Sequence, residues 1–170
     1  GVRLGLTNPE IYEMQVRAIY EALAELLQED VDAHPEIMVP QVACAEELRQ
    51  VRQIVEKVKR DVEGRYGREL NIHYGTMVEV VRAAITADEV GKVADFFSFG
   101  TNDLTQATFS FSREDAENKF LPQYMAKGVL KDNPFQTLDP KCVGKLLEIG
   151  TTLGMRANPS LVVGICGEHG

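Results

Sequence analysis

The sequence predicts an α/β fold built around a parallel β-sheet. Short apolar runs occur at residues 37–39, 70–74, 96–99 and 161–165, and longer stretches with helical spacing of apolar residues separate them. Strands that alternate with helices in this way are typical of parallel sheets with crossover helices. Two architectures stay open, a doubly wound sheet and part of a (β/α)8 barrel. In both of them ligands bind at the carboxyl ends of the strands.

The first part of the chain is expected to form a helix, a strand and a second helix. Asn8-Pro9 predicts the start of the first helix, because proline is favoured in the first turn. One face of that helix carries the apolar residues Ile11, Met14, Ala18, Ala22 and Leu26. Pro40 is expected at the end or edge of the first strand, since it has no N–H to donate to a neighbour. The second helix has an apolar face made by Leu48, Val51, Val55, Val58 and Val62.

The remaining segments continue the alternation to the last residues. The strand at 70–74 is expected to run into Gly75-Thr76. Residues 110–138 show no clean period and are too long for an ordinary connection, which is typical of a functional loop or of one that a ligand orders. Asp139-Pro140 is expected to open the last helix, before the strand at 161–165.

Composition and charge argue against several classes of protein. With 170 residues, 44% of them hydrophobic and 26% charged, the chain has the composition of one folded domain. No apolar stretch reaches the ~20 residues of a membrane helix, and the first residues lack the pattern of a signal peptide. A net charge of -8 without a cluster of Lys and Arg argues against nucleic-acid binding. The isolated cysteines Cys44, Cys142 and Cys166 predict a reducing compartment without disulfide bonds.

Polar residues that suit a ligand follow three of the predicted strands. Glu79 comes shortly after the second strand, Gly100-Thr101-Asn102-Asp103 follows the third, and Cys166 follows the fourth. The carboxyl ends of neighbouring parallel strands meet at one edge, so these residues are expected around one mouth. Glu79 and Asp103 suit Mg²⁺, which typically accepts one or two protein carboxylates. They are equally the acidic residues that helix N-termini favour, and both interpretations stay open.

Cys166 also has two interpretations. At the end of a strand and before Gly167, turn amides could stabilise a thiolate that acts as an acid or base. Alternatively, Cys166 is only a small buried hydrophobic residue. Cys166 and His169 have the spacing of half a zinc site, but no second pair of ligands completes it, so the sequence does not favour zinc.

Four stretches carry more information than local patterns do: GTMVEVVRAAITADE, DFFSFGTNDLTQATFSFSRED, NKFLPQYMAKG and VGICGEHG. Together they resemble the C-terminal, phosphoenolpyruvate-binding barrel of the phosphoenolpyruvate-utilising enzymes. The segment FSREDAENKFLPQYMAKGVL is similar to the pyruvate, phosphate dikinase branch of that family. The resemblance extends over essentially the whole chain. It implies that residues 1–170 are a fragment of this domain, roughly the C-terminal half of a (β/α)8 TIM barrel.

The resemblance implies a phosphotransferase that interconverts ATP, pyruvate and phosphate with AMP, phosphoenolpyruvate and diphosphate. It makes Mg²⁺ the expected cofactor and Glu79 and Asp103 its ligands. Cys166 is then the proton donor and acceptor at the methyl carbon of the substrate. The residues that bind pyruvate or phosphoenolpyruvate are, by the same resemblance, Glu79, Gly100, Thr101, Asn102 and Asp103.

The resemblance also implies partners and leaves alternatives. A phosphohistidine domain of a longer parent chain delivers the phosphoryl group in this family, and the barrel forms a homodimer. The family's arginine-rich part of the barrel precedes Gly1, so the chain alone is expected to be inactive, with unpaired sheet edges that favour self-association. The expected compartment is the cytoplasm, or else a plastid or other organelle. Phosphoenolpyruvate synthase, enzyme I of the sugar phosphotransferase system, and a non-catalytic dimerisation or binding fragment stay open as alternatives.

Overall fold

The computed structural model describes all residues from Gly1 to Gly170 and confirms an α/β fold with a parallel sheet. Four strands lie in chain order and every neighbouring pair is parallel. The strands are β1 Glu36–Val39, β2 His73–Val78, β3 Phe96–Gly100 and β4 Val162–Cys166. A doubly wound sheet reverses its strand order at a switch point, and this sheet does not. Its order is that of consecutive units of a barrel.

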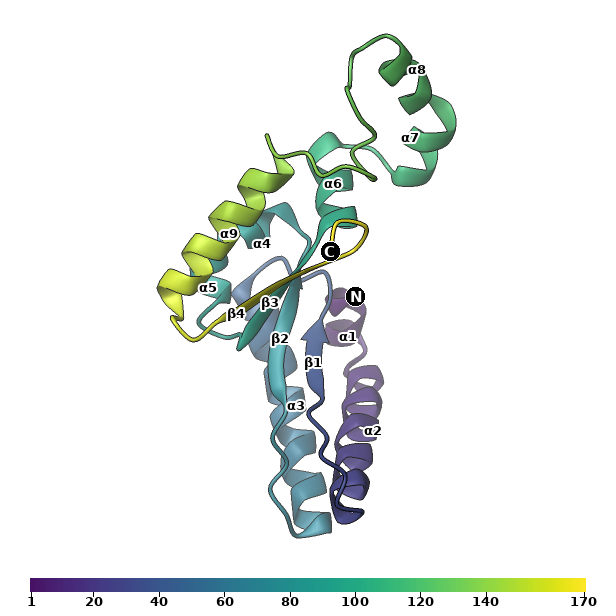
Figure 1. Cartoon of the computed structure of the whole chain (residues 1–170). Helices are drawn as coiled ribbons and strands as arrows, with labels where there is room; N and C mark the ends of the chain where they lie inside the picture. Colours follow the sequence, from purple (N-terminus) through teal and green to yellow (C-terminus); the bar gives the residue numbers. More distant parts are fainter.

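Nine helices accompany the sheet, and most of them connect one strand to the next (Figure 1). None of them is both long and apolar enough to cross a lipid bilayer. Their bounds are α1 Val2–Thr7, α2 Pro9–Gln28, α3 Ala45–Tyr66, α4 Val81–Ile85, α5 Ala87–Val90, α6 Thr101–Phe109, α7 Arg113–Lys119, α8 Leu121–Ala126 and α9 Val143–Ala157.

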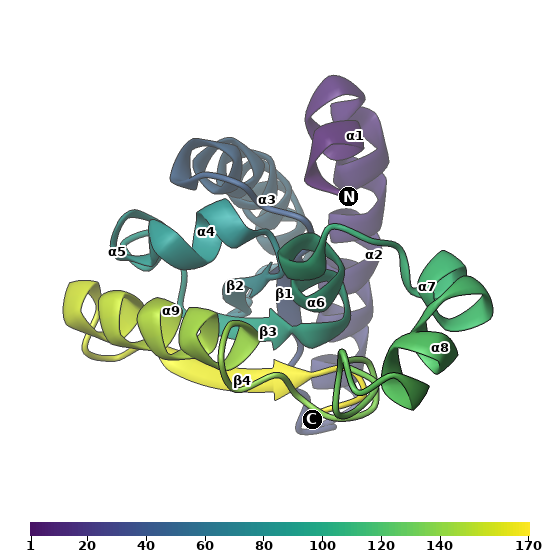
Figure 2. The ribbon, with the colours of Figure 1, turned by 90° about the horizontal axis from the view of Figure 1, so that it is seen from above.

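One face of the sheet is covered by helices α3, α4, α5 and α9, as the view from above shows (Figure 2). Helix α9 packs against α4 and α5, and α3 packs against α2. Alternate residues of the strands point into this layer, because side chains of a strand alternate between the two faces. The strand residues buried there are Ile37, Val39, Tyr74, Val78, Phe97 and Phe99, which belong to a core cluster of 29 buried residues.

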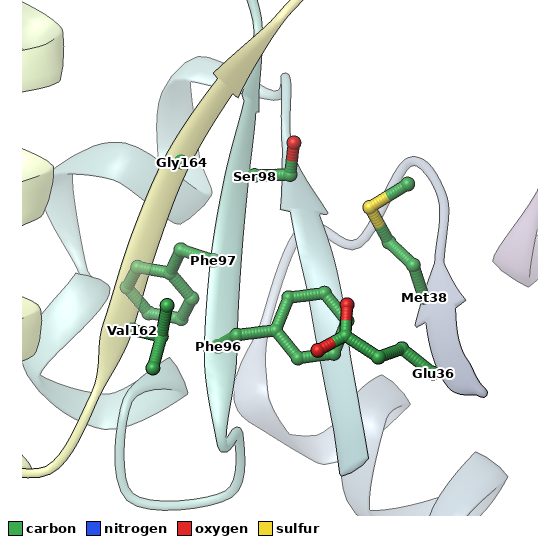
Figure 3. Close-up of a pocket in the computed structure, with 7 residues that line it drawn as sticks. All are labelled: Glu36, Met38, Phe96, Phe97, Ser98, Val162 and Gly164. Carbon is green, nitrogen blue, oxygen red and sulfur yellow. The ribbon is translucent and has the colours of Figure 1, made fainter. Parts of the chain in front are cut away.

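The other face of the sheet is not covered. Figure 3 shows the shallow pocket on this open face, which Glu36, Met38, Phe96, Phe97, Ser98, Val162 and Gly164 line. Met38 is 41% exposed and Val162 is 62% exposed. Phe96 is buried because its ring lies over Gly75, where an added Cβ would stand 2.6 Å from the ring carbons. Gly75 therefore makes room for the ring of Phe96.

Two predicted boundaries were wrong. Strand β2 begins at His73, after the predicted 70–74 run has largely passed, and it includes Gly75-Thr76. Leu70 is buried but lies in a loop, where its N–H donates to the Glu63 carboxylate at 2.8 Å. Its apolar side chain therefore suggested a strand where the chain forms a loop. Helix α9 begins at Val143, because Asp139 folds back in a turn and accepts the N–H of Lys141 at 3.1 Å.

Residues 111–138, which we call the lobe, are not an irregular loop. They contain helices α7 and α8, of seven and six residues, which are too short to produce a clear helical period. The lobe has a small core of its own, made by Ala116, Leu121 and Phe135. It projects beyond the end of the sheet at which the strands finish (Figure 1). The lobe therefore has apolar contacts of its own that hold its two helices together.

Candidate functional site

The carboxyl ends of β2, β3 and β4 lie side by side, so the structure brings the predicted site residues to one end of the sheet. Gly100, the last residue of β3, is the register partner of Cys166, the last residue of β4. Glu79 directly follows β2, and Asp103 lies in the first turn of α6. The three polar segments that the sequence placed around one mouth are therefore neighbours in space.

Glu79 and Asp103 line the same open pocket at this end of the sheet, together with Arg3, Gln41, Val80, Gln106, Ala107, Phe111 and Ser112. Gly100 is essential to this arrangement. A Cβ at position 100 would stand 2.9 Å from both Cβ and Oε2 of Glu79, closer than real side chains approach. The glycine of the GTND motif therefore leaves space for the Glu79 side chain.

The two carboxylates of the pocket influence one another. Glu79 is only 6% exposed. Burial raises the pKa of Glu79 above its ordinary value, and the nearby Asp103 carboxylate raises it further through a hydrogen bond and charge repulsion. The N–H of Gln41 donates to Oε1 of Glu79 at 2.7 Å, which works in the opposite direction. The net effect is a pKa of Glu79 above its ordinary value.

This donor set fits a divalent cation. Neither Glu79 nor Asp103 forms a salt bridge, although Arg3 lines the same pocket. No group of three or more His, Cys, Asp or Glu side chains is arranged to hold a metal. The chain therefore offers two carboxylates and no complete cage. Mg²⁺ is commonly held in this way, with one or two carboxylates, water and the substrate around it.

Gln41 is a site residue that the sequence reasoning missed. Its backbone has φ 58°, in the left-handed region that residues other than glycine seldom adopt. This conformation accompanies the hydrogen bond from its N–H to Glu79. Gln41 lies just beyond the end of β1, and the rule that ligands meet strand ends could have identified it.

Residues 166–169, which we call the Cys166 turn, lie against the start of α6. The Cys166 thiol donates to the carbonyl oxygen of Phe99 at 3.4 Å. The Thr101 hydroxyl donates to the Cys166 carbonyl at 3.1 Å, and Nδ1 of His169 lies 2.9 Å from the same hydroxyl oxygen. Asn102 accepts the N–H of Glu168 at 3.5 Å. The side chains of Thr101 and Asn102 therefore hold the Cys166 turn, while Asp103 faces the carboxylate pocket.

Comparison with known proteins gives the chain its family. The sequence model described as "PEP-utilising enzyme, PEP-binding domain" matches residues 1–170. Pyruvate, phosphate dikinase of Entamoeba histolytica is 55% identical over 171 residues, which cover 100% of this chain and 19% of that protein. The chloroplastic pyruvate, phosphate dikinase 1 of Arabidopsis thaliana is 51% identical over 170 residues, again with 100% of this chain and 18% of the relative covered. The chain thus spans about a fifth of the length of the curated relatives it matches. It belongs to the family of PEP-utilising enzymes and corresponds to their PEP-binding domain.

Proposed function

We propose that this chain is part of a phosphotransferase of the pyruvate, phosphate dikinase type, which interconverts ATP, pyruvate and phosphate with AMP, phosphoenolpyruvate and diphosphate. Residues 1–170 supply the Mg²⁺ and pyruvate side of the active site. The observation that carries the proposal is the pair of carboxylates, Glu79 and Asp103, that share one pocket beside the strand end that bears Cys166. The identity of about half of all residues to dikinases from a protist and a plant supports it.

Each residue of the site has a defined task in this proposal. Glu79 and Asp103 hold Mg²⁺, which supplies positive charge beside the anionic oxygens of the substrate when it is bound. Gly100, Thr101 and Asn102 form the backbone edge that the substrate contacts. Thr101 contributes only its main chain, because its side chain is fully buried and already bonded to the Cys166 turn.

Cys166 moves a proton at the methyl carbon of the substrate. In the direction of pyruvate, the proton passes from Sγ to the terminal carbon, and in the opposite direction it returns to the sulfur. The thiol hydrogen is engaged by the carbonyl of Phe99, at 3.4 Å, which fixes the sulfur at the end of β4. The phosphoryl group comes from a phosphohistidine domain of the longer parent chain, and the active parent is a homodimer.

Thermal unfolding of this chain with Mg²⁺, with oxalate as a mimic of the pyruvate enolate, and with both together tests the proposal. A ligand that binds only the folded state at 100 times its Kd stabilises it by about 2.7 kcal/mol, which raises Tm by about 5–10 °C for a domain of this size. We expect this increase only when both components are present. Cys166→Ala should retain the increase, because the thiol handles the proton and does not hold the ligand.

Asp103→Asn should abolish the increase in Tm, because it removes one of the two negative charges that hold the cation. Asp88→Asn is the matched control, since Asp88 is an exposed acidic residue in the first turn of α5, outside the carboxylate pocket. An increase of the same size in Asp103→Asn, or a cooperative wild-type transition that the ligands do not move, contradicts the proposal.

A further inference from the structure

Arg113 connects the lobe to the carboxylate pocket through a chain of hydrogen bonds. It is the first residue of α7, and its backbone N–H donates to Oε1 of Gln106 at 3.0 Å. The other end of the same amide, Nε2 of Gln106, donates to Oδ1 of Asp103 at 3.1 Å. Because one amide group makes both contacts, the start of the lobe and the Asp103 carboxylate are fixed relative to each other.

The side chain of Arg113 reaches in another direction, to the turn that follows Cys166. Its Nη1 donates to Oε1 of Glu168 at 2.9 Å, while its Nε donates to Oε2 of Glu117 at 3.2 Å. The guanidinium also lies over the ring of Phe135, with 5.5 Å from Cζ to the ring centroid. Glu117 is itself fixed by Nδ2 of Asn133 at 2.8 Å. The guanidinium thus touches two carboxylates and one aromatic face at once.

Such a contact differs from an ordinary surface ion pair. A single exposed pair contributes little, partly because two long side chains must lose their freedom to meet. Here Glu117 and Phe135 already fix the guanidinium, so the contact with Glu168 costs little further ordering. The planar fork of arginine can serve two carboxylates in fixed directions, which the single ammonium of lysine cannot do as well.

Glu168 carries this contact to the candidate catalytic thiol. It lies two residues after Cys166, and its N–H donates to Asn102. The turn is therefore held by α6 through its main chain and by the lobe through its side chain. Gly167, which lies between Cys166 and Glu168, has φ 90°, so the turn depends on a backbone conformation that other residues rarely adopt.

We propose that Arg113 is a positioning residue which, through Glu168, sets the place of the Cys166 turn relative to Asp103. The lobe then joins the two halves of the chemistry, the cation ligand and the proton donor. The importance of this for the reaction rests on the proposed function. The coupling between Arg113 and the Cys166 turn is a property of the chain alone and can be tested without any ligand.

The test is the rate at which iodoacetamide alkylates Cys166, followed peptide by peptide with mass spectrometry, with the exposed Cys142 as the reference in the same sample. We expect Arg113→Gln to raise the Cys166 rate several-fold and to leave Cys142 unchanged. Arg113→Lys should fall closer to wild type, because one carboxylate can still be reached. Lys119→Gln should behave as wild type, since it removes the same charge from α7 but pairs only with Asp115.

Glu168→Gln provides a second variant that leaves the lobe itself unchanged. It should raise the alkylation rate of Cys166 as Arg113→Gln does. The rate in the double variant should not exceed the larger of the two single effects, because both substitutions break the same contact between Arg113 and Glu168. Additive effects, or a Cys166 rate that is the same in Arg113→Gln as in Lys119→Gln, overturn the proposal.

The link to the reaction has a separate readout. In the presence of Mg²⁺, Gln106→Ala should weaken the binding of oxalate several-fold relative to Lys119→Gln, because the backbone N–H of Arg113 acts on Asp103 through the Gln106 amide, which this variant removes. If the folded wild-type chain shows no Mg²⁺-dependent binding of oxalate, the proposed function fails, and the alkylation rates still decide whether Arg113 positions the turn. If oxalate binds equally well to both variants, the link from Arg113 to Asp103 is wrong.

Discussion

The properties of the site depend on a few residues, above all Glu79, whose neighbours determine its burial, its pKa and its hydrogen bonds. Glu79 is buried beside a second carboxylate, and the left-handed backbone of Gln41 directs an N–H at it. Gly100 leaves the space that the Glu79 side chain occupies. Residue types at strand ends could be read from the sequence, and they pointed to Glu79 and Gly100. The raised pKa of Glu79 could not be read from the sequence, because it depends on burial in the folded chain and, after that, on the nearness of Asp103 at the next strand end.

The raised pKa of Glu79 predicts how stability without metal depends on pH. The folded chain holds the Glu79 proton more tightly than the unfolded chain, so the free energy of unfolding falls as the pH rises from about 4.5 through the raised pKa. Each unit by which the pKa is raised destabilises the ionised folded state by about 1.4 kcal/mol. We therefore expect Glu79→Gln to be more stable than wild type at pH 7 without Mg²⁺, and the difference to disappear near pH 3.

Chemical denaturation at the two pH values measures this effect. Glu10→Gln, at an exposed position in α2, shows what the loss of one negative charge does by itself. Bound Mg²⁺ should reverse the order at pH 7, since it stabilises wild type and not Glu79→Gln. A Glu79→Gln chain that is less stable than wild type at pH 7 without metal would mean that the carboxylate is favourably placed in its ionised form.

At the scale of elements, the strands and long helices follow their sequence patterns apart from the starts of β2 and α9, and the lobe follows no such pattern. Helix α3 buries Leu48, Val51, Val55, Val58 and Val62 along one face, as the spacing of these residues predicts. Helices α7 and α8 are short, and their apolar residues meet only after the chain has folded back on itself. The ring of Phe111 then lies 5.3 Å from that of Phe120 and 5.9 Å from that of Phe135. The residues of this cluster are far apart in the sequence, so no periodic pattern of apolar residues predicts it.

The small core of the lobe predicts local unfolding in Phe135→Ala. Removing a buried phenylalanine costs about 3–5 kcal/mol, which is more than a core of this size can lose. We expect hydrogen exchange by mass spectrometry to show faster exchange over residues 113–126 while α3 stays protected. Tyr124→Ala is the control within the lobe, since Tyr124 is 42% exposed. Protection of α7 in Phe135→Ala, or loss of protection throughout the chain, would show that the lobe is not a separate unit.

At the scale of the whole molecule, the sheet is covered on one face only. The helix layer buries the strand residues that face it, while the opposite face keeps Met38 and Val162 in contact with solvent. Strands β1 and β4 are also the edges of the sheet, with backbone groups that have no partner strand. An apolar open face between two free edges favours association with a second chain.

We therefore expect the isolated chain to self-associate through the open face and the β4 edge, and Val162→Lys to reduce this association. A charge on an edge strand opposes pairing with the edge of another sheet and weakens hydrophobic association of the apolar face. Val129→Lys is a closely matched control, because Val129 is 60% exposed against 62% for Val162 but lies in the lobe. Sedimentation velocity over a range of concentrations measures the effect. Equal association of the two variants would place the contact elsewhere on the molecule.

The sequence by itself determined the alternation of strands and helices, the parallel sheet, and the three strand ends at which Glu79, the GTND motif and Cys166 stand. These features are local, because the period of apolar residues and the type of residue after a strand are set by near neighbours in the chain. The tertiary structure alone decided which face of the sheet stays open, how Gln41 meets Glu79, and that Arg113 holds Glu168, 55 positions away. Such contacts follow from the packing of distant segments, and no short pattern of residues encodes them.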